Sequence, residues 1–351
     1  MECMISYCAN EKTVQMAFAV FRHGDRTTDA GTLYPNDPYI NETYEPYGLG
    51  ELTNTQEKKL QRGKRREYRL GQLLRLRYAL LLGKQYKKGT VRAVSTDSSR
   101  TQESLELVLA SLYPPRSTEL EWNRWLNWNP IAFEIAPHAT NRLLSIALMY
   151  CPSYRQLFDA YSKSEEGQQI ESMFNSQYEY ISNHSGLNVT KLFNLFRLYF
   201  GLLSENYLTR TTKKNYEMVV ATPQLNQLFG GFLLEDIIKE MRAKMNENGT
   251  LKKRKINLYS GHELNIAAIL GAMDVFFPHI PPYGACVLIE LHRHKDSYYV
   301  QIFYQDYSSR MLQPLTVPGC TFECPFEDFA KLLQKNLPGT KNGDPCLITR
   351  N

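Results

Sequence analysis

The chain has 351 residues, of which 43% are hydrophobic and 22% charged, so it is an ordinary globular sequence with room for two domains or one large domain. Its net charge of +5 suits a small anionic substrate and is too weak to indicate nucleic-acid binding. The sequence holds no run of about 18 uncharged apolar residues, so it predicts no transmembrane helix or membrane anchor.

The N-terminus and the glycosylation motifs give conflicting indications of location. Residues 1–8 have no basic region and no sustained apolar segment, so they do not form a signal peptide. Four Asn-X-Ser/Thr motifs favour a secreted protein, with the lysosomal lumen as second choice. We therefore expect that a leader is missing from this form of the sequence. The motif asparagines are Asn41, Asn183, Asn188 and Asn248.

The first predicted element is a buried strand over residues 14–21, which leads into the most informative segment of the chain. Residues 22–26 read Arg-His-Gly-Asp-Arg and place two guanidinium groups around one imidazole. Arginine donates a planar fork of hydrogen bonds that matches phosphate oxygens, and it stays charged at any relevant pH. The loop therefore predicts an anion site, in which His23 either attacks phosphorus or only helps to bind the anion.

The next elements alternate between helix and strand. Apolar residues spaced three and four apart predict a helix over residues 66–82. A strand over 90–94 follows, and then a helix over 105–112 that is ended by two prolines. Strands return late in the chain, over residues 255–259, 285–291 and 298–304.

These elements predict an α/β fold. We expect a three-layer sandwich with a mostly parallel central sheet and a smaller, mainly helical cap inserted in it. Residues 1–115 and 235–351 would form the core. Residues 116–234 would form the cap, because helical patterns such as 191–203 dominate there and strand signals are few.

The strand over 255–259 leads into a second polar loop. It ends in Ser260-Gly261-His262-Glu263, and a helix is predicted over residues 264–270. Ligands of open α/β sheets lie beyond the carboxyl ends of the strands, and helix N-termini there favour anions. Two such loops on adjacent strands would bring His23 and His262 to one pocket, with Glu263 as the nearby acid.

In these paired loops the chain resembles the histidine acid phosphatase family, which joins Arg-His-Gly-X-Arg to a distant His-Asp or His-Glu. The resemblance spans nearly the whole chain, and several segments look closest to the insect venom branch. Other matching segments are residues 34–38, 50–53, 95–97, 100–101, 113–115, 126–130, 281–283 and 315–325.

The resemblance implies a role for each residue of the two loops. His23 would be the nucleophile that forms a phosphohistidine, while Arg22, Arg26 and a protonated His262 neutralise the phosphoryl oxygens. Glu263 would donate a proton to the leaving group and then activate water, which implies an acidic optimum. The substrates would be small phosphate monoesters. No cofactor and no metal site are expected, and a homodimer is expected by resemblance alone.

Three departures from the family pattern stand out. We expect a third phosphate-binding arginine immediately before Ser-Thr-Asp, but Val94 occupies that position. Arg92 lies two residues earlier on the same strand face and is a candidate replacement. The segment 56–62 looks inserted, and the segment 206–222 looks short.

The pairing of the seven cysteines is inferred partly from their spacing and partly from the resemblance. The four-residue spacing of Cys320 and Cys324 fits either a small disulfide loop or a metal site, but no cluster with zinc spacing accompanies it. The resemblance implies the disulfides Cys320–Cys324 and Cys151–Cys346, with Cys286 as a free thiol. It gives no assignment for Cys3 and Cys8.

Three functions are compatible with these observations. A secreted acid phosphatase comes first. The second is a non-catalytic or weakly active secreted relative that binds phosphorylated ligands through the same pocket. The third, a mutase or specialised phosphatase of the wider Arg-His-Gly superfamily, is disfavoured by the Pro-Gly-Cys segment and the disulfide pattern.

Overall fold

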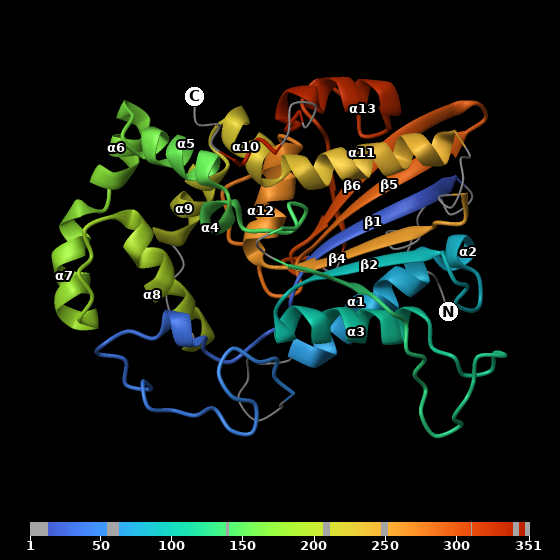
Figure 1. The fold of residues 1–351 in the computed structure, drawn as a ribbon, viewed down its shortest axis with the longest axis horizontal. Coiled ribbons are helices and arrows are strands. Elements are labelled where there is room, and N and C mark those ends of the chain that lie inside the picture. The colour runs from blue at the N-terminus through green and yellow to red at the C-terminus, as the bar shows by residue number, and fades with distance from the viewer. Residues whose placement is uncertain are drawn as a thin grey trace.

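One sheet of eight strands organises the molecule (Figure 1). The structure, a computed structural model, describes residues 13–54, 63–137, 140–205, 211–246, 252–309, 311–339 and 344–347. Its strand order is β3-β2-β4-β1-β5-β6-β7, and β8 pairs with β6. The strands are β1 Val14–Arg22, β2 Val91–Thr96, β3 Glu134–Ala136, β4 Ile256–Gly261, β5 Cys286–His294, β6 Ser297–Gln305, β7 Gln313–Leu315 and β8 Cys324–Pro325.

The sheet has a parallel half and an antiparallel half. Strands β3, β2, β4 and β1 pair in parallel, whereas β5 is antiparallel to β1 and β6 is antiparallel to β5. Strands β1, β2, β3, β4 and β6 therefore point one way, and β5, β7 and β8 point the other. The predicted α/β fold with a mostly parallel sheet is confirmed in the sense that five of the eight strands run in the same direction.

Helices cover both faces of the sheet and complete three layers (Figure 1). One face is covered by α1 Gly63–Arg77, α2 Ala79–Leu82 and α3 Ser99–Leu112. The other is covered by α11 Gly231–Met245, α12 Glu263–Ala272 and α13 Phe326–Leu333. Because β1 lies between these layers, alternate residues enter different cores: Phe18 packs towards α11 and α12, and Phe21 towards α1 and α3. A strand buried on both faces reads as a continuous apolar run, which explains why it is predictable from the sequence.

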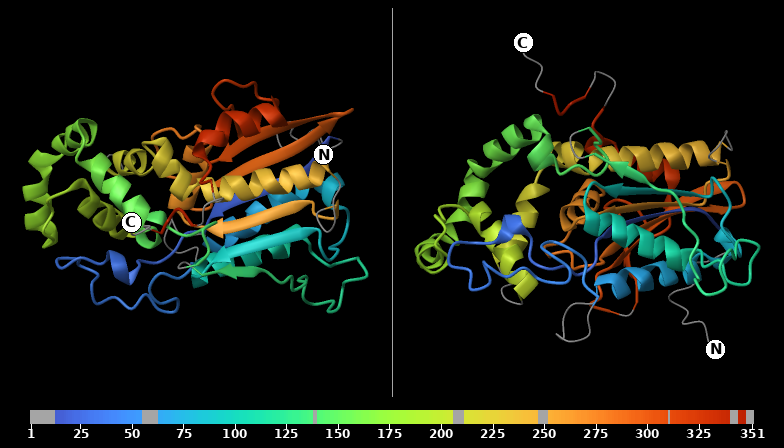
Figure 2. Two further views of the ribbon diagram at one scale, coloured as in Figure 1. Left: turned by 45° about the horizontal axis from the view of Figure 1, so that its top comes forward. Right: turned by 60° about the horizontal axis from the view of Figure 1, so that its bottom comes forward.

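A second group of helices lies beyond one end of the sheet, on the left in Figure 1 and the left view of Figure 2. These helices share an apolar core, which Leu264, Ala267 and Ala268 of α12 join to the sheet layers. They are α4 Ala147–Tyr150, α5 Pro152–Ser162, α6 Glu165–Ser172, α7 Asn175–Ser185, α8 Leu192–Glu205, α9 Thr211–Val219 and α10 Pro223–Phe229; the short helices η1 Ala30–Thr32 and η3 Gln334–Asn336 lie elsewhere in the chain.

The predicted limits of the cap do not coincide with the ends of elements. Strand β3 falls within residues 116–234, yet it pairs with β2 at the edge of the main sheet. Its three residues are too few to produce a strand pattern. Helix α11 crosses the predicted limit at 234 and packs on the sheet. The division into core and cap remains a prediction.

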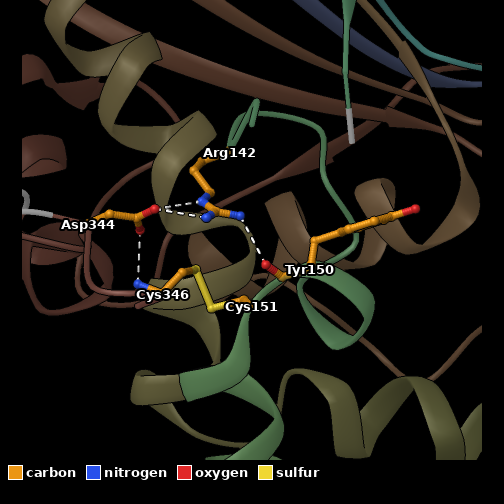
Figure 3. Close-up of a disulfide and its surroundings, with 5 residues drawn as sticks. All are labelled: Arg142, Tyr150, Cys151, Asp344 and Cys346. Carbon is orange, nitrogen blue, oxygen red and sulfur yellow. Dashed lines mark hydrogen bonds and ion pairs between the residues drawn. A yellow bond between two sulfur atoms is a disulfide. The ribbon is translucent and has the colours of Figure 1, made fainter. Parts of the chain in front are cut away.

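Two disulfides lie among the described residues, and their pairing is the one the resemblance implies. Cys320–Cys324 closes a short loop, and Cys151–Cys346 joins residues 195 apart at the start of α5 (Figure 3). In the chain-entropy model, closing a loop of that length stabilises the fold by about 5 kcal/mol. Cys286 is a buried free thiol.

Some expectations concern surface sites or segments that the structure does not describe. Asn41, Asn183 and Asn188 are exposed, whereas Asn248 falls in the undescribed range 247–251. Cys3, Cys8 and the segment 56–62 also lie outside the described residues, as do residues 206–210 of the segment that looks short. Among the helices that are described, none is both long and apolar enough to span a bilayer.

Candidate active site

The two polar loops meet where β1 and β4 end. The parallel register pairs Arg22 with Gly261, and the backbone N–H of His23 donates to the Gly261 carbonyl at 2.9 Å. Residues separated by more than 200 positions in the sequence are thus adjacent at the edge of the sheet where the carboxyl ends of β1 and β4 lie. This is the edge at which open α/β sheets bind ligands.

The glycine after His23 is required by a close backbone approach. A Cβ on Gly24 would lie 2.5 Å from the carbonyl oxygen of Gly63, at the start of α1. The loop is further held by Asp25, which accepts hydrogen bonds from Arg66 at 2.7 and 3.3 Å. Asp25 therefore stabilises the loop through its ion pair with Arg66.

His23 is held in one tautomer. Its Nδ1 lies 2.8 Å from the carbonyl oxygen of Gly24, and because a carbonyl only accepts, Nδ1 carries the proton. The lone pair is therefore on Nε2. The side chain is 1% exposed, and burial, followed by the charges of Arg100 and Arg22, lowers the pKa of His23 well below 6.5. His23 thus stays neutral under mildly acidic conditions.

His262 and Glu263 begin helix α12. His262 is its N-cap residue, and its backbone N–H donates to Asn265 Oδ1 at 2.9 Å. Its Nε2 lies 3.2 Å from the hydroxyl of Thr96 on β2, and its ring lies 5.5 Å from the ring of His23. Glu263 occupies the first helical position and is 9% exposed. The helix N-terminus adds positive potential next to His23.

Arg22 is the most enclosed of the loop cations. Its guanidinium lies 3.9 Å above the ring of Tyr283 and donates to the Pro281 carbonyl at 2.7 Å. Its Nε lies 3.2 Å from Glu263 Oε2. This ion pair holds the Glu263 carboxyl group next to Arg22.

A cavity of about 900 Å³ opens over these residues. His23, Arg26, His262 and Glu263 are among the residues that line it. Arg26 is 5% exposed, and one of its two terminal nitrogens donates to the Thr27 carbonyl at 2.7 Å. Among the described residues, no cluster of three or more histidine, cysteine, aspartate and glutamate side chains could hold a metal ion. The site can hold an anion between guanidinium groups, beside a neutral imidazole and a carboxyl group.

Residues 13–195 and 159–305 match the profile of the histidine phosphatase superfamily (branch 2). The chain belongs to this superfamily. It is 34% identical to venom acid phosphatase Acph-1 of Apis mellifera, over 92% of this chain and 85% of that protein. It is 32% identical to prostatic acid phosphatase of Rattus norvegicus, over 93% and 87% of the two chains. The lysosomal acid phosphatase of Homo sapiens shares 30% identity, over 93% and 79%.

Solved structures agree with this fold. The apo form of Hafnia alvei phytase superposes with a TM-score of 0.64 at 16% identity, covering 95% of this chain and 98% of that one. Identity that low supports the shared architecture and does not transfer a substrate.

This histidine phosphatase has an arginine in its cavity that the sequence interpretation missed. Arg100 lines the cavity from the first turn of α3 and lies 3.3 Å from Asp29. Of the charged groups that lower the pKa of His23, Arg100 has the largest effect. The signal was available: Arg100 begins a helix directly after the carboxyl end of β2, where anion-binding groups gather.

The expectation that Arg92 replaces the third arginine is wrong, whereas the expectation for Val94 stays a prediction. Val94 is 1% exposed, packs in the apolar core between the sheet and α11, and is not among the residues that line the cavity. Arg92 donates at 2.7 Å to both Asp236 and Glu240 of α11 and does not replace a missing phosphate ligand.

Proposed function

We propose that this histidine phosphatase is an acid phosphatase that hydrolyses phosphate monoesters through a phosphohistidine on His23. The observation that carries the proposal is the neutral imidazole of His23, with its lone pair on Nε2, lining a cavity beside Arg26, Arg100 and His262. Cations that surround a neutral nucleophile neutralise the phosphoryl oxygens without blocking attack. The named relatives, all acid phosphatases, support the same activity.

In the first step, the Nε2 lone pair of His23 attacks phosphorus and the bond from phosphorus to the ester oxygen breaks. Arg26, Arg100 and protonated His262 hold the three non-bridging oxygens. The leaving oxygen takes a proton from the carboxylic acid of Glu263 and departs as an alcohol. Arg22 keeps that carboxyl group in position through its 3.2 Å contact.

In the second step, water attacks the phosphohistidine. The Glu263 carboxylate takes a proton from the water, the N–P bond breaks, and inorganic phosphate leaves with His23 neutral again. The acidic preference follows from the need for protonated Glu263 and His262. The low pKa of His23 keeps the nucleophile available at the same acidic pH.

The proposed setting is outside the cytosol. Venom, prostatic and lysosomal relatives support a secreted or lysosomal protein, and the exposed sequons at Asn41, Asn183 and Asn188 favour secretion with glycosylation. The buried Cys151–Cys346 disulfide is typical of an oxidising compartment. A homodimer remains a prediction from resemblance.

The test is hydrolysis of para-nitrophenyl phosphate at acidic pH by the full chain. We expect His23→Ala to lower kcat by about a thousandfold or more, because the covalent route is lost. The matched control is His184→Ala, an exposed histidine of α7 outside the cavity, which should keep the wild-type rate.

The phosphohistidine itself is measured by quenching the enzyme with radiolabelled substrate in alkali, where phosphohistidine survives. Label on wild-type protein and none on His23→Ala is the expected result. Equal rates for the two proteins would refute the nucleophile. Phosphate binding without turnover would instead identify the non-catalytic relative.

A further inference from the structure

A row of basic residues lies at the edge of the sheet opposite the catalytic loops, on the right in Figure 1. At this edge the parallel strands β2, β4 and β1 begin and the antiparallel strand β5 ends. Three short segments reach it: residues 84–90 before β2, residues 252–255 before β4, and residues 293–297 where β5 turns into β6. They contain one acid, Asp296, and nine basic residues: Lys84, Lys87, Lys88, Lys252, Lys253, Arg254, Lys255, Arg293 and Lys295.

Backbone hydrogen bonds hold the three segments side by side. The N–H of Lys255 donates to the Thr90 carbonyl at 2.9 Å, which joins the first two segments. The N–H of Ala17 donates to the Lys255 carbonyl at 2.9 Å, and the N–H of Arg293 donates to the Thr13 carbonyl at 2.8 Å, so β1 joins the third. Neighbouring strands lie about 4.8 Å apart, so the three steps from β2 to β5 spread the basic side chains over roughly 15 Å.

The positive charges of this edge are close enough to affect one another. Burial, and after it the charge of Lys87, lowers the pKa of Lys255 below 10.5. Two of the nine basic residues have a carboxylate near the outer limit of an ion pair: Arg254 lies 3.8 Å from Glu240, and Arg293 lies 4.0 Å from Asp296. Repulsion between like charges is relieved when an anion binds among them.

A small cavity of about 180 Å³ lies between the second segment and the third. Three cations, an amide and a phenol line it: Lys244, Lys252, Arg293, Gln15 and Tyr298. Lys244, near the end of α11, donates to the Lys252 carbonyl at 2.7 Å and so holds this helix against the second segment. The Arg293 guanidinium carbon lies 5.5 Å from the centre of the Tyr298 ring. The cavity therefore offers several hydrogen-bond donors to one sulfate or phosphate group.

The chemistry of this edge favours a linear polyanion over a membrane or a nucleic acid. Peripheral membrane binding adds apolar side chains that enter the lipid, but the exposed large apolar residues of the described chain lie outside the three segments. Single-stranded nucleic acids stack their bases on exposed aromatic rings. Tyr86 and Tyr298 are half-buried, and Tyr86 packs against Tyr113. A chain of sulfate groups needs only a row of cations.

We propose that this face, formed by the nine basic residues and Lys244, binds a sulfated polysaccharide of the heparin type. One sulfate group occupies the cavity between Lys252 and Arg293, and the neighbouring sulfates pair with the lysines of the other segments. Strand β1 has nine residues, so the face lies roughly 25 Å from the catalytic edge. The bound protein therefore keeps its catalytic cavity open. The inference does not rest on the phosphatase proposal, because it concerns the opposite end of the sheet.

The experiment titrates the full chain with a heparin octasaccharide by calorimetry, at several salt concentrations around about 0.15 M. The logarithm of the association constant should fall linearly with the logarithm of the salt concentration, because counterions are released on binding. The octasaccharide of N-acetylheparosan, which has the same type of backbone without sulfate groups, should bind at least about tenfold more weakly. Equal binding of the two octasaccharides would overturn the proposal.

Two matched double variants locate the binding face. Lys252→Gln with Arg293→Gln removes two cations of the small cavity, and should weaken heparin binding about tenfold or more and reduce the salt slope by about two. Lys163→Gln with Arg69→Gln removes the same charge from exposed positions outside the face, and should change binding much less. Thermal unfolding checks that both variants fold. Equal losses in the two variants would mean that only the net charge matters, which overturns the proposal.

Two further measurements separate this face from the catalytic cavity. Heparin binding should persist when inorganic phosphate saturates the protein, and hydrolysis of para-nitrophenyl phosphate should continue when heparin saturates it. Loss of heparin binding in phosphate would place the polyanion in the catalytic cavity and overturn the proposal. Hydrolysis without sulfate-dependent binding would overturn it and leave the phosphatase function intact, whereas binding without hydrolysis would do the reverse.

The choice of a polysaccharide is tested against the other polyanions. Phosphatidylserine vesicles and a short DNA duplex are titrated under the same conditions as the heparin octasaccharide. Both should bind more weakly than heparin, and the Lys252→Gln with Arg293→Gln variant should lose affinity mainly for heparin. Tighter binding of the vesicles or of the duplex would overturn the assignment to a sulfated polysaccharide.

Discussion

The catalytic edge and the antiparallel half of the sheet both bury charge, but they balance it differently. In the antiparallel half, Glu290 is fully buried and accepts hydrogen bonds from Arg77, Tyr78 and His292. Burial alone would raise the pKa of Glu290, yet the His292 hydrogen bond and the Arg77 charge hold it below 4.5. Each charged group there has its partner within the protein.

The catalytic edge carries more guanidinium groups than carboxylates. Arg22 is paired with Glu263 and Arg100 with Asp29, but Arg26 has no carboxylate partner among the described residues. Buried cations in excess are unfavourable until an anion binds. We infer that the Glu290 cluster stabilises the fold, and the proposed function predicts that the surplus positive charge at the catalytic edge binds an anion.

The largest expected effect tests the balanced cluster. Glu290→Ala leaves Arg77 buried without its carboxylate, so the free energy of unfolding should fall by about 3–5 kcal/mol. Denaturant unfolding monitors this loss, and kcat per folded molecule should be unchanged. The double variant Arg77→Met with Glu290→Leu should recover part of the stability, because no unpaired charge remains, although Tyr78 and His292 lose the acceptor of their hydrogen bonds. A double variant less stable than Glu290→Ala would contradict this account of the cluster.

The next effect tests the cation surplus. Arg100→Ala should lower kcat/KM for para-nitrophenyl phosphate by about 10- to 100-fold, since a charge-assisted phosphate contact contributes about 1.5–3 kcal/mol. The acid limb of the pH–rate profile should also move to higher pH. Arg100 lowers the pKa of His23, so removing it lets His23 gain a proton, and lose its nucleophilic lone pair, at a higher pH.

Arg92→Ala is the matched control for Arg100. Arg92 is paired with Asp236 and Glu240 and does not line the cavity, so its loss should affect stability and leave kcat/KM unchanged. If Arg92→Ala lowered kcat/KM as much as Arg100→Ala and left the pH profile alone, the assignment of the third arginine would be wrong.

A smaller effect separates Val94 from the phosphate site. Val94→Thr adds a hydroxyl to an apolar core and should reduce the free energy of unfolding by about 1–3 kcal/mol. The inhibition constant for inorganic phosphate should not change, because Val94 packs against the helix layer. A changed inhibition constant at unchanged stability would mean that Val94 lies at the phosphate site.

The error at Arg92 and the correct prediction that His23 and His262 lie at one pocket have a common physical origin. A buried strand followed by a glycine turn is a local pattern, so the loops that hold His23 and His262 could be found from the sequence. Which of Arg92, Val94 or Arg100 reaches the cavity depends on where β2 ends and how α11 packs, and neither is local. Strand β3 was missed for a similar reason, because its pairing with β2 is a long-range contact.

Glu67 differs from both of these clusters, because it is a buried carboxyl group without a hydrogen-bond partner among the described residues. It lies on α1 with no exposed surface. Burial raises the pKa of Glu67 well above 4.5, with Arg66 opposing and Asp25 adding to the shift. Glu67 is therefore neutral in the folded protein at mildly acidic pH.

The stability of the protein should fall as pH rises from the ordinary carboxyl pKa, because the unfolded chain releases the Glu67 proton while the folded protein keeps it. Glu67→Gln removes this contribution to the pH dependence of stability. The unfolding free energy of the variant minus that of wild type should therefore increase by up to about 1.4 kcal/mol per pH unit until the folded pKa is reached. Glu106→Gln, at an exposed position on α3, corrects for the loss of a surface carboxylate. A difference that stays constant with pH would mean that folding does not shift the pKa of Glu67, and one that decreases would mean that Glu67 is ionised in the fold beside a cation.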